Sequence, residues 1–233
     1  METSGFSLLE LFRLGGVFMW PLLLFSVATI AIALERGVFI FYHNLSLDDL
    51  KEKLDEFLKQ GKIKEAEDWL SALTKRRPGA RVLLALLEKA VPHSGGKRSS
   101  EDAAVIERRL EKAAEAEAAK CINSLENGFN FLTALGSVSP LTGFLGTVSG
   151  MIGAFRSIAE AVDVNAQIVA NGIYEALITT VFGLIIAIIA MVAHSLFTHI
   201  VDKFASNLEM LCSDIIIDLS ESVPSLEKDN NEN

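Results

Sequence analysis

The chain has 233 residues, of which 50% are hydrophobic without glycine being counted and 22% are charged. A composition this apolar excludes a disordered protein, a collagen-like fibre and a small disulfide-stapled domain. The formal net charge of −9, with no basic stretch unmatched by acid, argues against nucleic acid as a partner.

Three long stretches carry no charged residue: residues 14–34, 127–155 and 176–201. Each is longer than the roughly 18–20 residues that an α-helix needs to cross about 30 Å of hydrocarbon. The sequence therefore predicts three transmembrane helices in a lipid bilayer. The first stretch is not expected to be a signal peptide, because Glu2 and Glu10 precede it where a basic start would be required.

Positive charge is concentrated between the first two stretches. Of the 21 Lys and Arg residues, 16 lie between His43 and Phe129, whereas the segment between the second and third stretches holds only Arg156. Basic residues mark the cytoplasmic side of a membrane protein. The predicted topology has the N-terminus outside, a large cytoplasmic loop, a short outer loop and a cytoplasmic C-terminus.

Apolar residues recur at helical spacing through the predicted cytoplasmic loop. Ser46 and Asp49 resemble a capping box at the start of a first helix, and Gly61 is expected to end that helix. Two further helices are predicted over residues 62–75 and 80–90, on either side of a Pro-Gly turn.

An Ala-rich, charge-rich stretch from Glu101 has strong helix propensity, and its helix is expected to continue through Gly128 into the second membrane stretch. The charges on this helix are interpreted as a solvated face. Residues from Glu221 onward are acidic and rich in Asn, and they are expected to be disordered. No strand pattern occurs in the sequence, so the predicted fold class is all-α.

These features predict a polytopic membrane protein with a helical cytoplasmic domain. Its segments are, in chain order, an outer N-terminal segment (1–13), transmembrane helix 1 (14–42), the helical cytoplasmic domain (43–128), transmembrane helix 2 (129–155), a short outer loop (156–167), transmembrane helix 3 (168–200), and a cytoplasmic helix extension with an acidic tail (201–233).

Cysteine and histidine give no pattern typical of a metal or cofactor site. Cys121 and Cys212 are 91 positions apart, and neither belongs to a CxxC motif. Both lie on the predicted cytoplasmic side, where thiols stay reduced. His194 and His199 are five positions apart, so they share a helix face poorly. No metal and no cofactor are expected.

The second apolar stretch carries small residues every three or four positions, among them Gly143, Gly146 and Gly150. Such spacing lets helix backbones approach closely in lipid, so these glycines are interpreted as a packing seam. Pro140 removes one backbone hydrogen bond and is expected to kink the helix. The hydroxyl of Thr147 either bonds back to its own helix or belongs to a polar stripe that faces water.

The third stretch carries a small-residue packing stripe, with Glu175 and Thr180 beside it. The stripe consists of Gly172, Ala176, Thr179, Gly183, Ala187 and Ala190. An ionisable group at membrane depth costs at least about 2.5–3.5 kcal/mol, so Glu175 is a functional-site hypothesis. Two depths stay open for this carboxylate. A span that begins at residue 176 leaves it interfacial, whereas a span that begins at residue 168 places it about 10 Å along the helix.

The motifs of these two stretches resemble those of the MotA/TolQ/ExbB proton-channel family, and of its ExbB/TolQ branch most closely. Residues 140–151 follow the pattern P-x-x-G-[LF]-[LF]-G-T-V-x-G-[IM], and residues 172–183 follow G-I-x-E-A-L-x-x-T-x-x-G. The sequence Ala-Leu-Glu-Arg at residues 33–36 fits as well, and the three-span layout matches ExbB and TolQ. Asn171 departs from the pattern, because the branch commonly has Pro there.

The resemblance implies a motor subunit of the cell's inner membrane. It implies a homopentamer whose second and third spans line a pore, and a single-span partner of the ExbD/TolR type that carries a membrane Asp. By the same resemblance Thr147, Glu175 and Thr180 line the proton path, with both threonines near that Asp. Work would be done on an envelope system through a TonB/TolA-like protein. TonB-dependent import, Tol-type envelope maintenance and another transport or gliding task all stay open.

Two other classes of function stay open from the residues themselves. A structural scaffold would use the small-residue seams only for assembly, and it would tolerate neutralisation of Glu175. An intramembrane enzyme would need a nucleophile and a base, or a metal cluster, within the spans. Only Glu175, His194 and hydroxyl groups are present there, so no enzymatic activity is expected.

Overall fold

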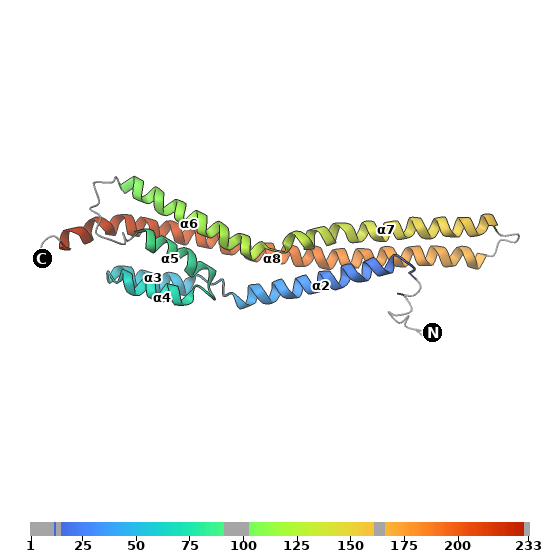
Figure 1. Ribbon diagram of the computed structural model, residues 1–233, viewed down its shortest axis with the longest axis horizontal. Helices are drawn as coiled ribbons and strands as arrows, with labels where there is room; N and C mark the ends of the chain where they lie inside the picture. Colours follow the sequence, from blue (N-terminus) through green and yellow to red (C-terminus); the bar gives the residue numbers. More distant parts are fainter. Residues whose placement is uncertain (1–11, 13–14, 91–102, 161–165, 231–233) are drawn as a thin grey trace. The chain divides into compact units, whose positions relative to one another are not determined.

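In a computed structural model of the chain, residues 12, 15–90, 103–160 and 166–230 are described, and they form helices and turns without a β-strand (Figure 1). The all-α fold class is thereby confirmed. The helices are α2 (Met19–Tyr42), α3 (Asp48–Lys59), α4 (Ile63–Leu73), α5 (Pro78–Ala90), α6 (Ala103–Glu126), α7 (Phe129–Glu160) and α8 (Ala166–Asn230).

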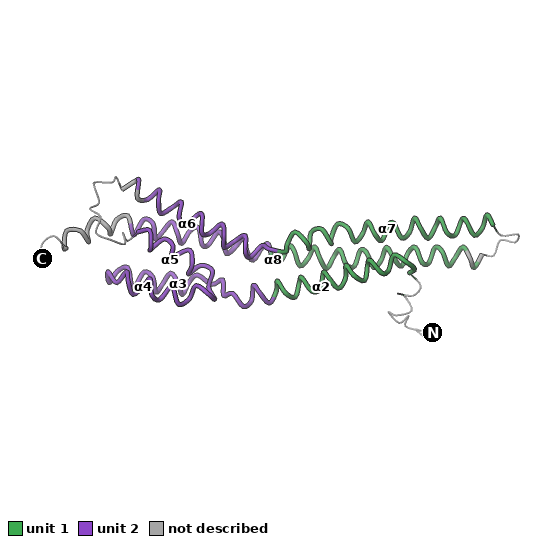
Figure 2. The backbone as a smooth tube through the Cα atoms, viewed as in Figure 1, with its two compact units in different colours: residues 1–37, 128–197 green, residues 38–127, 198–233 purple. Residues whose placement is uncertain are grey.

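Three stretches of helix are long and apolar enough to cross a membrane, namely Met19–Tyr42, Glu107–Glu160 and Val169–Leu219. The prediction of three membrane-spanning helices is therefore confirmed. The chain divides into two compact units, shown in Figure 2. Unit 1 comprises residues 1–37 and 128–197, and unit 2 comprises residues 38–127 and 198–233.

Unit 1 contains most of α2, all of α7 and the first half of α8. A core cluster joins Met19 and Leu22 of α2 to Ile178 and Ile186 of α8. The outward faces carry large apolar side chains, such as Phe144, which is 64% exposed. A continuous apolar surface of this kind suits lipid or other membrane helices rather than water.

The helices of unit 1 differ at three ends from the boundaries that the sequence predicts. α2 begins at Met19 rather than at residue 14, because Gly16 has a left-handed φ of 67° that interrupts a regular helix. α7 continues to Glu160, which pairs with Arg156 at 2.8 Å one turn away. α8 begins at Ala166, so both helices extend into the range 156–167 that the sequence assigns to a loop.

α6 and α7 are separate helices, although the sequence predicts one continuous helix. α6 ends at Glu126 and α7 begins at Phe129. Gly128 between them has a φ of 92°, a left-handed value that glycine adopts without a steric penalty. The expectation of continuity is wrong because this glycine acts as a helix stop rather than as a tolerated interior residue.

Unit 2 contains α3, α4, α5, α6 and the second half of α8, and it has a core of leucines. Pro78 occupies the first position of α5, where its missing N–H does no harm. α5 therefore begins two residues before the predicted Ala80. The leucines that are no more than 1% exposed are Leu50, Leu54, Leu70, Leu83, Leu86, Leu87, Leu110 and Leu208.

The predicted capping box of the first cytoplasmic helix does not form. α3 begins at Asp48 after Leu47, and Leu47 makes no side-chain cap bond. The Ser46 N–H instead donates to Asn44 Oδ1 at 3.0 Å, a local turn that competes with capping. Gly61 has a φ of 67° just beyond the end of α3, which confirms its predicted role as a helix stop.

The C-terminal part of α8 also differs from expectation. The sequence favours disorder from Glu221 onward, whereas the backbone is helical as far as Asn230. Once a helix exists, each added residue contributes one hydrogen bond for the two dihedral angles it fixes. Extension of α8 across the acidic tail is therefore easier than starting a new helix there.

Candidate functional site

The seam between α7 and α8 is built from glycines that bring the two backbones into contact. A Cβ atom on Gly143 would lie 2.8 Å from the Thr179 carbonyl oxygen and 3.0 Å from the Thr180 Cα. A Cβ atom on Gly183 would lie 2.6 Å from the Ser139 carbonyl oxygen. Side chains rarely approach backbone atoms so closely, so glycine alone fits this geometry without a shift of the helices.

The seam continues along both helices through Gly150 and Gly172. A Cβ atom on Gly150 would lie 3.0 Å from the Gly172 carbonyl oxygen and 3.1 Å from the Ala176 Cβ. A Cβ atom on Gly172 would lie 2.7 Å from the Ala154 Cβ. The glycines that the sequence assigns to helix packing thus lie on one line of close contact between α7 and α8.

Pro140 lies in the interior of α7 and leaves the carbonyl of Gly136 without its helical donor. Gly136 faces α8, where an added Cβ atom would lie 3.0 Å from Met191 Cγ. Ser139 is fully buried, and its hydroxyl donates to the Leu135 carbonyl at 2.6 Å. The turn of α7 that proline weakens is therefore held inside the seam.

Two adjacent threonines of α8 donate hydrogen bonds across the seam. Thr180 Oγ1 donates to the Gly143 carbonyl at 3.1 Å. Thr179 Oγ1 lies 2.8 Å from the Ala176 carbonyl oxygen and 3.3 Å from that of Gly143, so its proton is shared between the two. Thr179 is 1% exposed, whereas Thr180 is half-buried. The glycine at 143 leaves its carbonyl uncovered, and both hydroxyls reach it.

Thr147 makes its hydrogen bond within α7. Its hydroxyl donates to the Phe144 carbonyl at 2.6 Å, which is the first of the two possibilities that the sequence leaves open. The neighbouring Gly146 faces α8 instead, since an added Cβ atom there would lie 2.8 Å from the Thr179 Cβ. Thr147 itself is half-buried.

Glu175 is the carboxylate of the third span, nine residues after the start of α8 and therefore about 14 Å along the helix. Its Oε1 atom lies directly against Gly16, where any side chain would collide with the carboxylate. Gly16 has a φ of 67°, so the turn before α2 takes a shape that favours glycine. That turn covers one side of the half-buried carboxylate.

The three residues predicted to line a proton path are not joined directly. Among the described residues, no hydrogen bond links Thr147, Glu175 and Thr180 to one another. The seam brings Thr180 to Gly143, and it leaves Glu175 beside the turn at Gly16.

The sequence analysis places Thr179 on the small-residue stripe of the third stretch but assigns no role to its hydroxyl. It misses Gly16 altogether, because Gly16 is 159 positions from Glu175 and no pattern links the two.

The chemistry available in unit 1 is that of carboxyl and hydroxyl groups. Over the described ranges, no cluster of three or more His, Cys, Asp or Glu side chains could hold a metal ion. Cys121 and Cys212 are free thiols buried in unit 2. His194 packs edge-on against Phe129, with 6.0 Å between ring centroids. The polar side chains identified at the seam are the hydroxyls of Thr179 and Thr180, and the carboxylate of Glu175 lies beside the Gly16 turn.

Known proteins similar to this chain are membrane transport components. Residues 75–210 match the family described as the MotA/TolQ/ExbB proton channel family. The chain is 28% identical to the biopolymer transport protein ExbB of Salmonella typhimurium, over 85% of this chain and 79% of that protein. It is 30% identical to the biopolymer transport protein exbB1 of Vibrio cholerae, over 87% and 84% of the two chains.

A second match covers fewer residues at a higher identity. The chain is 47% identical to the Tol-Pal system protein TolQ of Haemophilus influenzae, over 32% of each chain. The family match at residues 75–210 includes both motifs and the whole α7–α8 seam from Gly136 to Gly183. The resemblance that the motifs indicate is therefore confirmed.

Proposed function

We propose that this chain, which belongs to the MotA/TolQ/ExbB proton channel family, conducts protons as a motor subunit of the ExbB/TolQ branch. The family supports a role in membrane energy transduction. The proposal adds that a partner of the ExbD/TolR type works with it, and that the proton motive force is converted into mechanical work on the cell envelope.

The observation that carries the proposal is that one helix, α8, holds both Thr180, which donates across the seam, and Glu175, a half-buried carboxylate beside the Gly16 turn. Five residues separate them, which is about 7.5 Å along α8. Thr180 already donates to the Gly143 carbonyl across the seam. A carboxyl group holds and releases a proton, and a hydroxyl can donate one proton while it accepts another. Since positions five apart point to different sides of a helix, the two groups would act at separate points of the proposed path rather than in direct contact.

In the proposed mechanism a single-span partner brings a membrane aspartate to Thr147 and Thr180. The hydroxyls accept from the protonated carboxyl and donate to the ionised one, which lowers the penalty for charge in an apolar wall. Glu175 supplies the exchangeable proton near the Gly16 turn. Each proton that crosses 100 mV of membrane potential releases about 2.3 kcal/mol, which is the energy available for moving the partner.

The proposal includes the assembly and its orientation. Five copies would surround the partner, with α7 and the first half of α8 lining the pore. The 16 basic residues between His43 and Phe129 support a cytoplasmic position for that region in the inner membrane, with the N-terminus outside. Relatives named for biopolymer transport and for the Tol-Pal system both match the chain, so the energised process is an envelope task of either type, acting through a TonB/TolA-like protein.

Substitutions of Thr180 separate a proton path from a packing seam. Val is nearly isosteric with Thr but lacks the hydroxyl, while Ser keeps the hydroxyl in a smaller side chain. We expect Thr180→Val to abolish proton-driven activity with the oligomer intact, and Thr180→Ser to keep part of it. Glu175→Gln should likewise assemble and lose activity. Proton flux in vesicles that contain the chain and its partner measures the effect, alongside oligomer yield.

Thr142→Val is the matched control, because the Thr142 hydroxyl donates to the Val138 carbonyl of its own helix at 3.0 Å and makes no contribution across the seam. It should leave proton flux unchanged. In a structural scaffold the order for Thr180 reverses, since an apolar methyl suits a lipid-buried seam. Full activity of both Thr180→Val and Glu175→Gln would therefore favour the scaffold over the channel.

A further inference from the structure

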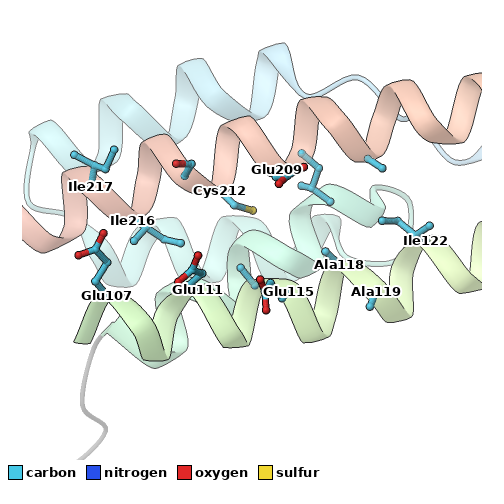
Figure 3. Close-up of a pocket in the computed structure, with 14 residues that line it drawn as sticks. Glu107, Glu111, Glu115, Ala118, Ala119, Ile122, Glu209, Cys212, Ile216 and Ile217 are labelled. Carbon is cyan, nitrogen blue, oxygen red and sulfur yellow. The ribbon is translucent and has the colours of Figure 1, made fainter. Parts of the chain in front are cut away.

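Unit 2 contains an open groove of about 450 Å³ between α6 and α8, shown in Figure 3. Its floor is apolar and comes from both helices. On α8 the floor residues Leu208, Cys212 and Ile216 follow one another at intervals of four, which places them on one face. On α6 the corresponding residues are mainly alanines.

The sequence of α6 explains why the groove is open. Ala114, Ala118 and Ala119 line it, whereas Leu110 and Leu125, the large buried side chains of the same helix, are not among the lining residues. Alanine projects only one methyl group from the helix, so α6 cannot fill the space beside α8. The groove therefore results from the small residues on this part of α6.

Four glutamates border the apolar floor. Glu107, Glu111 and Glu115 recur at intervals of four along α6, and Glu209 comes from α8. Figure 3 shows Glu111 and Glu115 projecting from α6 into the space that faces α8. In the part of the chain that the structure describes, none of the four makes an ion pair.

Another glutamate of α6 shows that the lack of ion pairs is specific to the groove side. Glu117, on a different face of the helix, pairs with Arg81 at 2.6 Å and with Lys120 at 2.9 Å. These two cations hold the charge on Glu117 in place within the unit. Among the residues that the structure describes, the glutamates of the groove have no such cations, so like charges stand side by side and exposed along its border.

We propose that this groove binds a cationic amphipathic helix of another protein. Leu208, Cys212 and Ile216 are themselves buried, so apolar side chains of the bound helix would cover the lining residues that are still accessible, Ala119 and Ile122 of α6 and Ile217 of α8. Its Lys or Arg residues would face the glutamates. The row from Glu107 to Glu115 spans eight residues, about 12 Å or two helical turns. Basic residues spaced four apart on the partner match that row, in the manner of a helix that lies in a groove.

The negative charge of the groove favours a cationic helix over other ligands. Phosphate groups would be repelled by four carboxylates. A second copy that docked through the same face would bring its own row of glutamates against this one, so it is a poor electrostatic match for the groove. Binding in the groove does not require proton conduction, and it can be measured without a membrane potential.

A pair of labelled peptides tests the groove on the full chain in discs of zwitterionic lipid. One peptide is a short amphipathic helix of Leu and Lys, and the other has Glu in place of every Lys. We expect the Lys peptide to bind, the Glu peptide not to bind, and discs without protein to give the background. Glu111→Lys should weaken the Lys peptide about fivefold or more, and Glu111→Gln should weaken it less.

Glu52→Lys is the matched control, because Glu52 is an exposed residue of α3 outside the groove and the substitution changes the net charge by the same amount. It should change the affinity by no more than about twofold, as expected for a screened remote charge. Equal weakening by Glu52→Lys and Glu111→Lys would show a general attraction to acidic surface and overturn the proposal.

A photo-crosslinking amino acid in place of Ala119 identifies the occupant directly. An adduct of the chain with the Lys peptide, absent when the crosslinker replaces the exposed Ala116 instead, supports the proposal. A covalent dimer of the chain at position 119 would show that a second copy fills the groove. That result, or no adduct with either peptide, would overturn it.

Discussion

In unit 1 close contacts between helices are made by glycines such as Gly143, Gly150 and Gly183, whose added Cβ atoms would lie no more than 3.0 Å from the facing helix. In unit 2 the core is made of leucines, such as Leu70 and Leu86, that are fully buried. The helices of unit 1 therefore pack through backbone contacts at glycines, whereas the helices of unit 2 pack through large apolar side chains.

The difference follows from the solvent around each unit. Apolar residues of a water-exposed bundle gain about 25 cal/mol for each Å² of apolar surface removed from water, so large side chains stabilise most. In lipid that gain is absent, and association depends on close van der Waals contact and on hydrogen bonds between helices. Glycines at the α7–α8 seam supply the contact, and the hydroxyls of Thr179 and Thr180 supply the bonds.

The largest expected effect is the loss of a leucine from the core of unit 2. Leu86→Ala should lower the free energy of unfolding by about 2–5 kcal/mol, because it removes a fully buried side chain and leaves a cavity. Leu84→Ala, at a half-buried position of the same helix, should cost no more than about 1–2 kcal/mol.

Tryptophan fluorescence during denaturation measures this effect in unit 2 alone. The chain has two tryptophans, of which Trp69 lies in α4 and Trp20 in α2. A Trp20→Phe background leaves Trp69 as the reporter. Equal losses for Leu84→Ala and Leu86→Ala would mean that the leucine core does not decide the stability of this unit.

The next effect concerns the seam of unit 1. Gly143→Ala places a methyl group 2.8 Å from a backbone oxygen, so the helices must separate, at an expected cost of about 1–3 kcal/mol. Gly153→Ala is the control in the same helix, because nothing lies within 4 Å of an added Cβ atom there. It should stabilise the helix by up to about 0.5–1 kcal/mol.

Thermal unfolding in detergent, followed by Trp20 in a Trp69→Phe background, measures both glycine variants. Opposite signs for the two substitutions would sharpen the contrast between the units, because the same added methyl group is harmful only where backbones touch. If both stabilise, the seam is looser than its glycines indicate.

The sequence predicted the helices better than their ends. The absence of charge over residues 14–34 and 176–201 identifies membrane spans because charge in hydrocarbon is costly, a property of composition alone. Gly128 looked like a tolerated interior glycine, since nothing local distinguishes that role from a left-handed stop. Ser46 looked like a cap, but its N–H had a nearer acceptor in Asn44.

Parts of the candidate site could not be predicted from the sequence, for a different reason. The motifs identify Thr180 and Glu175, but hydrogen bonds and contacts depend on how two helices are rotated against each other. Spacing places Thr179 and Thr180 almost equally well against α7, and only the geometry shows that both reach Gly143. The contact of Glu175 with Gly16 joins residues from distant parts of the chain, which no local pattern reports.

The smallest effect is expected at the surface of unit 2, where Lys51 Nζ of α3 pairs with Asp214 Oδ2 of α8 at 2.6 Å. Both side chains are about half exposed, so the pair is screened and its contribution falls with salt. The hydrogen bond and charge of Asp214 raise the pKa of Lys51.

Because the pKa of Lys51 is raised in the folded state, the stability that this ion pair contributes is fully present below the ordinary pKa range of lysine. It is lost as the pH rises through the higher pKa of the folded protein. A double-mutant cycle of Lys51→Gln and Asp214→Asn, measured by thermal unfolding at low and high salt, should give a coupling that is small at neutral pH, smaller in high salt and absent in strong alkali. If the coupling energy were as large as the stability lost in Gly143→Ala, a surface ion pair would contribute to unit 2 as much as a backbone contact contributes to unit 1. Unit 2 could then no longer be described as stabilised chiefly by its leucines.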